Sequence, residues 1–168
     1  MLSEVDTAHW YAVYTRCNHE KTAAEYLGNR AIEHFMPLYE TMRTWKDRRK
    51  RLEMPLFPGY VFVRIPLRQR VSVLTAPGVI RLVGFNNRAA ALPDEEVDKL
   101  RSIVKQGLNA EPHPYLAAGH KVRITRGALQ GMQGVLIRKK GRLRLVLSID
   151  LIQQSATIEI DSADVRTA

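Results

Sequence analysis

The sequence predicts a two-domain α+β protein: an N-terminal domain of mixed helices and strands, a short linker and a small C-terminal β-barrel. Three observations lead to this prediction. Residues 60–65 form a nearly continuous apolar run, which is typical of a central strand buried on both faces. An amphipathic helix pattern follows Pro93, and beyond residue 117 only short β-forming runs occur. A chain of 168 residues is long enough for two such domains.

The N-terminal domain is expected to begin with a strand at residues 10–14, Trp-Tyr-Ala-Val-Tyr, which have high β propensity. Asn18 is expected to cap a helix over residues 19–30. One face of that helix is expected to carry Ala23, Ala24, Leu27 and Ala31. Residues 35–44 should be extended. They lead into a basic cluster at 46–51, which should form a solvated hairpin tip because like charges repel inside a core.

Residues 52–57 should return from this tip to a Pro-Gly interruption, after which the strand at 60–65 follows. A short helix is expected within 68–76 and a short strand at 79–83. The clearest helix starts after Pro93, with three acidic residues in its first turn, where the helix dipole favours anions. Gly107 is expected to end it.

A change in composition follows that helix. Residues 109–116 contain two prolines and no apolar periodicity, so a linker is expected there, between domains at 1–108 and 117–168. The second domain should contain short strands at 121–125, 134–139, 143–149 and 156–160, with a hairpin turn at Lys140-Gly141. No long helix is expected in it, which favours a small barrel.

Charge and composition narrow the class of protein. The net charge of +9 and a pI of about 10.0 favour a polyanionic neighbour. Cys17 is the single cysteine, which excludes an internal disulfide. The chain lacks an apolar run long enough to cross a membrane and its start does not resemble a signal peptide, so a cytoplasmic protein without a membrane partner is expected.

Nothing in the sequence indicates catalysis. The five histidines show no metal-ligand spacing, and no nucleophile motif or phosphate-loop motif is present. The glycines at 127, 131 and 134 lack a following Lys-Ser/Thr and are expected to serve turns. We therefore expect no cofactor, no metal and no enzymatic activity, with an enzyme of unfamiliar site as a competing hypothesis.

Two segments together carry a resemblance. The first is Pro-Leu-Phe-Pro-Gly-Tyr-Val-Phe-Val at 55–63, which follows the Trp-Tyr strand. The second is Gly-His-Lys-Val-Arg-Ile at 119–124, followed by a glycine-punctuated stretch at 127–135. In this order they resemble the NusG amino-terminal domain followed by a KOW motif, over roughly 9–107 and 117–166. The resemblance implies an α/β sandwich around a mainly antiparallel sheet, a flexible linker and a five-stranded, SH3-like barrel.

The resemblance also implies partners and sites. The first domain of such proteins grips the clamp helices of RNA polymerase through an apolar depression and disfavours pausing. By matching position, the candidates for that contact are Tyr14, Phe57, Pro58 and Tyr60, with Phe57 as the exposed anchor, whereas Trp10 is expected in the core. Candidates for non-template or upstream DNA are Arg16, Arg68 and Arg70, and the hairpin residues Arg48, Arg49, Lys50 and Arg51 could contact polymerase or nucleic acid.

The KOW domain of relatives recruits a small-subunit ribosomal protein or the Rho terminator, and Leu151 and Ile152 are the matching candidates. Residues 151–155 depart from the Phe-Gly-Arg-like turn usual in housekeeping NusG. The departure favours a specialised paralogue resembling RfaH, UpxY and LoaP, a monomeric antitermination factor. Housekeeping NusG acting with Rho and a general KOW protein that binds nucleic acid or ribosomes are the alternatives. The β-branched residues of the second domain predict a stable β-structure rather than a helical hairpin.

Overall fold

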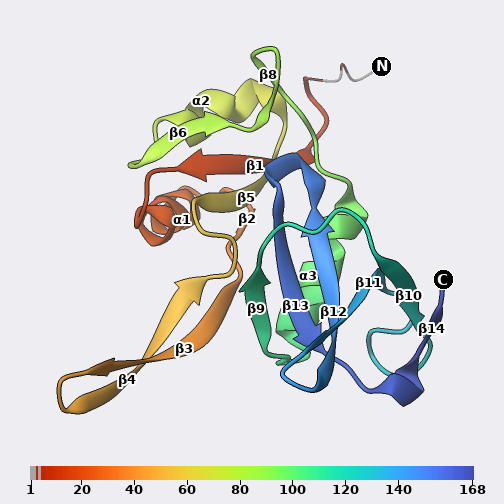
Figure 1. Ribbon diagram of the computed structural model, residues 1–168. Coiled ribbons are helices and arrows are strands. Elements are labelled where there is room, and N and C mark those ends of the chain that lie inside the picture. The colour runs from red at the N-terminus through yellow and green to blue at the C-terminus, as the bar shows by residue number, and fades with distance from the viewer. Residues whose placement is uncertain (1–2, 4) are drawn as a thin grey trace. The chain divides into compact units, whose positions relative to one another are not determined.

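The structure, a computed structural model, describes residue 3 and residues 5–168. The chain divides into two compact units. One comprises the residues up to Leu38 together with Phe57–Val97, and the other comprises Tyr39–Leu56 and Asp98–Ala168. Strands outnumber helices among the described residues, and every ladder in the sheets is antiparallel. Figure 1 shows these elements. The α+β class is therefore confirmed, while the domain boundaries at 108 and 117 stay a prediction.

The first unit is built on a four-stranded antiparallel sheet. Its strands, in spatial order, are β2 (His34–Phe35), β5 (Tyr60–Ile65), β1 (His9–Thr15) and β6 (Val79–Leu82). The predicted central strand is confirmed, because β5 lies between β2 and β1 and its residues Val61, Phe62 and Val63 are all fully buried. Burial of three consecutive residues requires apolar packing on both faces of the sheet.

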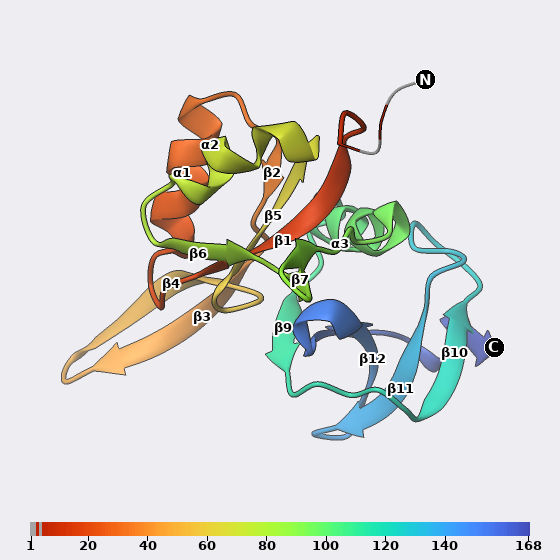
Figure 2. The same ribbon diagram turned by 90° about the horizontal axis from the view of Figure 1, so that it is seen from above.

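Two helices cover one face of this sheet, α1 (Glu20–Asn29) and α2 (Arg70–Leu74), the latter preceded by a 3₁₀ turn at Leu67–Gln69 (Figure 2). Ala24 and Leu27 of α1 and Val73 of α2 pack against one set of alternating strand residues, namely Tyr11, Val13, Val61, Val63 and Ile65. Small residues on α1 allow the helix to lie close to the sheet. The opposite face carries the alternate residues, which include Tyr14, Tyr60 and Phe62.

The start of α1 differs from the prediction. The residue at the N-cap position is His19, not Asn18, and its side chain makes no capping bond. Asn18 instead adopts a left-handed conformation with φ 63°, and its backbone N–H is accepted by the Glu20 side chain at 3.3 Å. Ala31 lies beyond the end of the helix at φ 55°. An asparagine tolerates the left-handed region, so the turn uses Asn18 for its backbone rather than for its side chain.

A small hairpin follows β6 and was not predicted. Strands β7 (Gly84–Phe85) and β8 (Arg88–Ala89) pair across a turn in which Asn86 and Asn87 have φ of 51° and 60°. Two successive positive φ angles are what a type I′ hairpin turn requires, and asparagine is favoured there. The Asn-Asn pair is the sequence signal for this hairpin.

The predicted helix after Pro93 is confirmed as α3 (Asp94–Lys105), with its three acidic residues in the first turn. Gly107, at φ 68°, donates its N–H to the Val104 carbonyl at 3.1 Å, and Leu108 donates to the Ile103 carbonyl at 3.2 Å. This pair of bonds is the Schellman arrangement that a glycine permits at the end of a helix.

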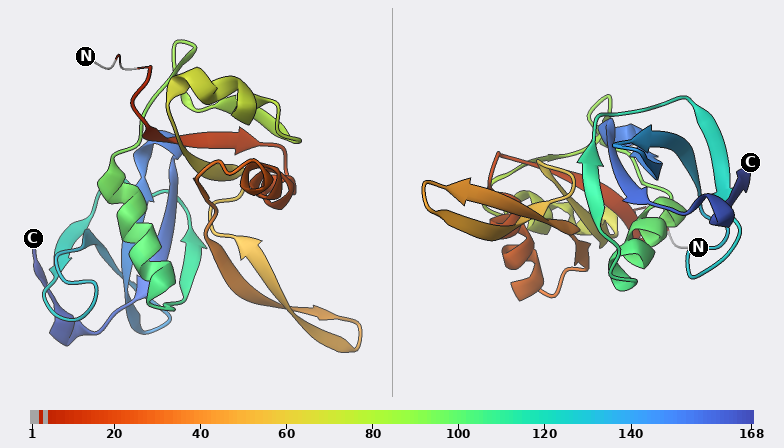
Figure 3. Two further views of the ribbon diagram at one scale, coloured as in Figure 1. Left: turned by 180° about the vertical axis from the view of Figure 1, so that it is seen from behind. Right: turned by 60° about the horizontal axis from the view of Figure 1, so that its bottom comes forward.

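Strands β3 (Leu38–Trp45) and β4 (Arg48–Pro55) form a separate two-stranded sheet. Figure 3 shows them as a long twisted ribbon, which we call the β3–β4 arm. The connecting turn is only Lys46-Asp47. Arg48, Arg49, Lys50 and Arg51, expected at the hairpin tip itself, therefore lie along β4 next to the turn.

The second unit also contains a six-stranded antiparallel sheet. Its spatial order is β14 (Val165–Thr167), β10 (His120–Ile124), β11 (Gln133–Lys139), β12 (Arg142–Ile149), β13 (Gln154–Glu159) and β9 (Ala110–His113). The strands are curved (Figure 2), and Leu145 and Ile158, which lie opposite each other on β12 and β13, are buried on one face of the sheet. The predicted turn at Lys140-Gly141 is confirmed, with φ of 53° and 74°.

Two expectations for this unit need revision. Residues 109–116 were expected to be an irregular linker, but they include β9, which pairs with β13 from Ala110↔Ile158 to His113↔Ser155. Proline lacks an N–H, and Pro112 is accommodated because β9 ends the sheet order and needs one ladder only. The sheet has six strands rather than five, and its order has two ends, β14 and β9, so closure into a barrel stays a prediction.

Candidate functional site

A row of three side chains crosses the face of the first sheet that lies opposite α1 and α2. Tyr60 on β5 lies opposite Tyr14 on β1, and Tyr14 lies opposite Arg81 on β6. The two tyrosine rings have centroids 5.4 Å apart at an interplanar angle of 45°. The Arg81 guanidinium lies 5.7 Å from the Tyr14 ring centroid, within the range of a cation–π contact. Both tyrosines are half-buried, so each presents part of its ring to a partner.

The Pro58-Gly59 turn beside Tyr60 is anchored by a buried carboxylate. Glu20, only 6% exposed, accepts the Gly59 N–H at 3.1 Å as well as the Asn18 N–H at 3.3 Å. The Gly59 carbonyl in turn accepts the Thr15 N–H at 2.8 Å. Hydrogen bonds to an ionised acceptor are stronger than neutral ones, so Glu20 fixes the turn to the start of α1. No local sequence pattern indicates this role, since Glu20 and Gly59 are 39 residues apart in the chain.

Gly59 has the conformation that this turn requires. Its φ is 89°, a region that side chains rarely adopt. A Cβ at this position would lie 3.6 Å from the Tyr14 ring, which is ordinary contact. The conformation and not the available space therefore favours glycine here.

The Tyr60 hydroxyl is held in its neutral form. Burial raises the pKa of Tyr60 above its usual value, neighbouring Tyr14 raises that pKa further, and Arg81 partly opposes both effects. A phenol with a raised pKa remains protonated at physiological pH, so it can donate a hydrogen bond to a partner as well as accept one.

Phe57 does not belong to this exposed surface. Its side chain is 1% exposed and meets Phe62 edge-to-face, with ring centroids 5.9 Å apart and an interplanar angle of 78°. The prediction of Phe57 as an exposed anchor is therefore wrong, because its ring is buried against Phe62 on the side of the sheet opposite α1 and α2. Pro58 is exposed, as a contact residue should be. Trp10 is 2% exposed, which confirms its assignment to the core.

The predicted basic residues of the first unit are all exposed but are not all equivalent. Arg68 pairs with Asp6 at 3.6 Å, whereas Arg16 has an exposed side chain beside the Gly78 turn. Arg70 lines a recess of about 380 Å³. The other residues lining it include Arg81, Arg88, Leu74 and Ile80. The structure therefore adds Arg81 and Arg88 to the cationic candidates and places Arg81 at both the tyrosine row and this recess.

The predicted partner-binding residues of the second unit lie just after β12. Asp150–Ile152 form a 3₁₀ turn, in which Ile152 is buried and Leu151 is half-buried. The turn is held by the Tyr115 hydroxyl, which donates to the Asp150 carboxylate at 2.7 Å. This bond raises the pKa of Tyr115. Ile152 is therefore a core residue, and of the two predicted residues only Leu151 has side-chain surface that a partner could contact.

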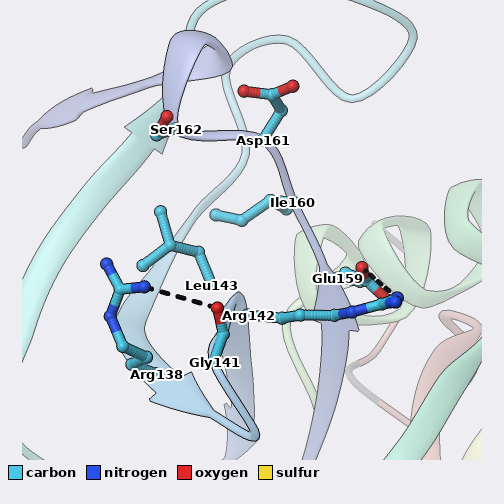
Figure 4. A pocket seen from close by; sticks show the side chains of 8 residues that line it. All are labelled: Arg138, Gly141, Arg142, Leu143, Glu159, Ile160, Asp161 and Ser162. Atoms are coloured by element: carbon cyan, nitrogen blue, oxygen red, sulfur yellow. Dashed lines mark hydrogen bonds and ion pairs between the residues drawn. The ribbon is translucent and has the colours of Figure 1, made fainter.

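A second recess lies between β11, β12 and β13 of the same unit (Figure 4). Arg142 pairs with Glu159 at 2.8 Å, and Arg138 donates to the Gly141 carbonyl at 3.4 Å. Both guanidinium groups are thus engaged within the sheet. The recess offers no nucleophile paired with a base, and we assign no chemistry to it.

The described part of the chain also offers no group of three or more His, Cys, Asp or Glu residues placed to hold a metal ion. Cys17 is exposed. Across the residues with described structure, no helix is both long enough and apolar enough to span a bilayer. The candidate surfaces for a partner on these two units include the tyrosine row, the arginine-lined recess and the β3–β4 arm.

Comparison with known proteins shows that this chain belongs to a class of transcription factors. A family model described as "Transcription termination factor nusG" matches residues 8–101, which contain the tyrosine row and the Pro58-Gly59 turn. The chain belongs to the NusG family.

Curated relatives extend the match beyond the first unit. The transcription termination/antitermination protein NusG of Escherichia coli strain K12 is 26% identical over 184 residues, covering 99% of this chain and 100% of its own length. That of Yersinia pestis is 26% identical over 181 residues, covering 98% of each chain. The solved structure "Domain interaction in Thermotoga maritima NusG" has a TM-score of 0.57 at 18% identity, covering 97% of this chain and 98% of its own, and supports the fold.

Proposed function

We propose that this chain is a non-enzymatic elongation and antitermination factor that binds RNA polymerase through the Tyr14–Tyr60 surface. The observation that carries the proposal is this half-exposed aromatic pair, which lies beside the Glu20-bound turn within the segment that matches the family. Aromatic side chains that are already ordered bury a large area at small entropic cost, which suits them as anchors at an interface. The clamp helices of polymerase, implied by the family resemblance, are the proposed partner.

Nucleic acid is the second proposed partner. Arg81 belongs to the tyrosine row, and Arg16 and Arg70 are exposed on the same unit, so upstream or non-template DNA passing there would be contacted through its phosphates. Such contacts give affinity without base discrimination. Arg68 is a weaker candidate because Asp6 already neutralises it. In the second unit, Leu151 is the proposed contact for a ribosomal small-subunit protein or Rho.

The polymerase test compares variants by co-purification with core RNA polymerase. We expect Tyr60→Ala and Tyr14→Ala to weaken binding by about 30-fold or more, since anchor residues at interfaces are worth about 2 kcal/mol or more. Tyr26→Ala is the matched control, because Tyr26 is a half-buried tyrosine on α1 that stacks against Arg30. Equal binding by all variants would reject the tyrosine row as the contact.

The antitermination role is tested by reconstituted transcription across a Rho-dependent and an intrinsic terminator. We expect the wild-type chain to increase read-through and Tyr60→Ala to lose this effect. Enhanced release at the Rho-dependent terminator would instead support a housekeeping role with Rho. A general KOW protein that binds nucleic acid or ribosomes would need no polymerase contact, so its signature is nucleic-acid binding without polymerase binding.

A further inference from the structure

The β3–β4 arm exposes a large aromatic side chain beside its turn. Trp45, the last residue of β3, is 64% exposed, and Met42 on the same strand is 56% exposed. Tryptophan is among the residues with most to gain from burial, and here no neighbour covers it. The chain has two tryptophans, and the other, Trp10, is 2% exposed in the core. The exposed Trp45 ring is therefore a candidate contact for a binding partner.

The end of the arm sorts its side chains onto two faces. Because only Lys46 and Asp47 connect the strands, Trp45 and Arg48 lie opposite each other, and residues two positions apart share a face. Arg43 and Lys50 thus lie on the Trp45 face. The ion pair between Arg51 and Glu40, at 3.6 Å, lies on the other face and agrees with this alternation.

The Trp45 face is cationic and uncompensated. Residues 42–51 include six basic side chains and one acidic side chain. Within the described ranges, none of Arg43, Arg48 or Lys50 has an ion-pair partner, and all three are exposed. A tryptophan ring flanked by three free cations combines a stacking surface with phosphate-binding groups. This combination is how proteins hold unpaired strands, whose bases are free to stack.

We propose that the end of the β3–β4 arm binds an unpaired DNA strand, with Trp45 stacked on a base and Arg43, Arg48 and Lys50 on the neighbouring phosphates. The inference deepens the proposed function by naming the form of nucleic acid that the basic residues of the hairpin contact. Duplex DNA is excluded as the preferred ligand because its bases present no free face to Trp45. The three cations are hydrogen-bond donors without acceptor atoms, so none of them can accept a hydrogen bond from the 2′ hydroxyl of RNA.

The test uses the full chain without polymerase, so that its outcome is separate from that of the polymerase contact. The probes are an oligothymidylate of about twelve nucleotides, within the site size of such surfaces, and a duplex of the same length. We expect the single strand to quench the fluorescence of Trp45, whereas Trp10 is buried and is shielded from contact with the bases. We also expect tighter binding of the single strand than of the duplex at equal salt.

Three variants separate stacking from charge. Trp45→Ala should weaken single-strand binding about 5- to 150-fold, the effect of one lost base–aromatic stack, and leave the salt dependence unchanged. Trp45→Phe should restore most of the affinity. Lys50→Ala should reduce the slope of log affinity against log salt by about 0.7, the value for one phosphate contact on a single strand.

The matched control is Phe85→Ala, which removes another exposed aromatic from a two-stranded hairpin, 70% exposed on β7. It should leave oligonucleotide binding unchanged. Equal affinities of wild type and Trp45→Ala would overturn the proposal, and so would equal affinities for single strand and duplex. Tighter binding to oligouridylate would assign the arm to RNA instead. Loss of polymerase binding by Trp45→Ala, without oligonucleotide binding by the wild type, would make the arm a protein contact.

Discussion

Replacement of Phe57 by alanine should destabilise the first unit rather than remove a contact with a partner. The phenyl ring is 1% exposed and packs edge-to-face on Phe62. Truncation of such a ring costs about 3–5 kcal/mol, of which about 0.5–1.5 kcal/mol comes from the aromatic pair. With a urea dependence of about 2 kcal/mol per molar for a small domain, the unfolding midpoint should fall by roughly 2 M. Phe57→Leu should cost only about 1 kcal/mol, since most of the volume is kept.

The assay is urea unfolding followed by tryptophan fluorescence in a Trp45→Phe background. In that background Trp10 is the sole tryptophan and reports from the core of the first unit. Tyr60→Ala serves as the comparison, because Tyr60 is half-buried and should shift the midpoint less. If Phe57→Ala kept the wild-type midpoint and lost polymerase binding, Phe57 would be an interface residue after all and the burial argument would fail.

Two further predictions concern the tyrosine row and its anchor. The pKa of Tyr60 is raised by burial and by Tyr14, so its neutral form stabilises the fold fully below the ordinary tyrosine pKa and this contribution is lost as the pH rises through the raised value. Titration of tyrosinate absorbance should show one fewer late-titrating group in Tyr60→Phe, and an unchanged titration curve would contradict this. Glu20→Ala should lower the free energy of unfolding by about 1–3 kcal/mol, because Gly59 and Asn18 each lose a charged acceptor. Glu20→Gln, which keeps one acceptor oxygen, should lose less free energy of unfolding in the same urea assay. Equal losses in the two variants would show that the negative charge of Glu20 does not contribute to these hydrogen bonds.

The local sequence pattern was sufficient to predict those elements whose structure is determined by residues close together in the sequence. The apolar run at 60–65 became the central β5, and the acidic first turn with Gly107 became α3. The Lys140-Gly141 turn follows from residue types that accept positive φ. In each case a period of two, a period of 3.6 or a turn preference was enough, because the competing structures were locally unfavourable.

The site depended on pairings that no local pattern encodes. Arg81 reaches Tyr14 only because β6 pairs antiparallel with β1 in one register, and a slip of one residue would point it to the helix-covered face. Glu20 reaches Gly59 for the same reason, through the placement of α1 against the sheet. Phe57 precedes a turn, so the sequence does not determine whether its side chain points into the core or toward solvent. In the structure the ring points into the core, where it packs against Phe62.

The β-structure of the second unit depends on a strand that lies inside the predicted linker. β9 pairs with β13, and just beyond it the Leu116 N–H donates to the Ser155 hydroxyl at 3.1 Å while the Ser148 hydroxyl donates to the Leu116 carbonyl at 2.7 Å. A fragment of residues 117–168 would leave this edge of β13 unpaired and the nearly fully buried Ser155 without one of its partners.

We therefore expect a fragment of 109–168 to unfold cooperatively and to give a β-type circular dichroism spectrum. The shorter fragment should be less stable by about 1–3 kcal/mol or more, the cost of a single buried polar group left unsatisfied. Equal stability of the two fragments would show that residues 109–116 behave as a linker, as the sequence predicted. A dominantly helical spectrum of the longer fragment would contradict both the structure and the β-branched pattern of β11, β12 and β13.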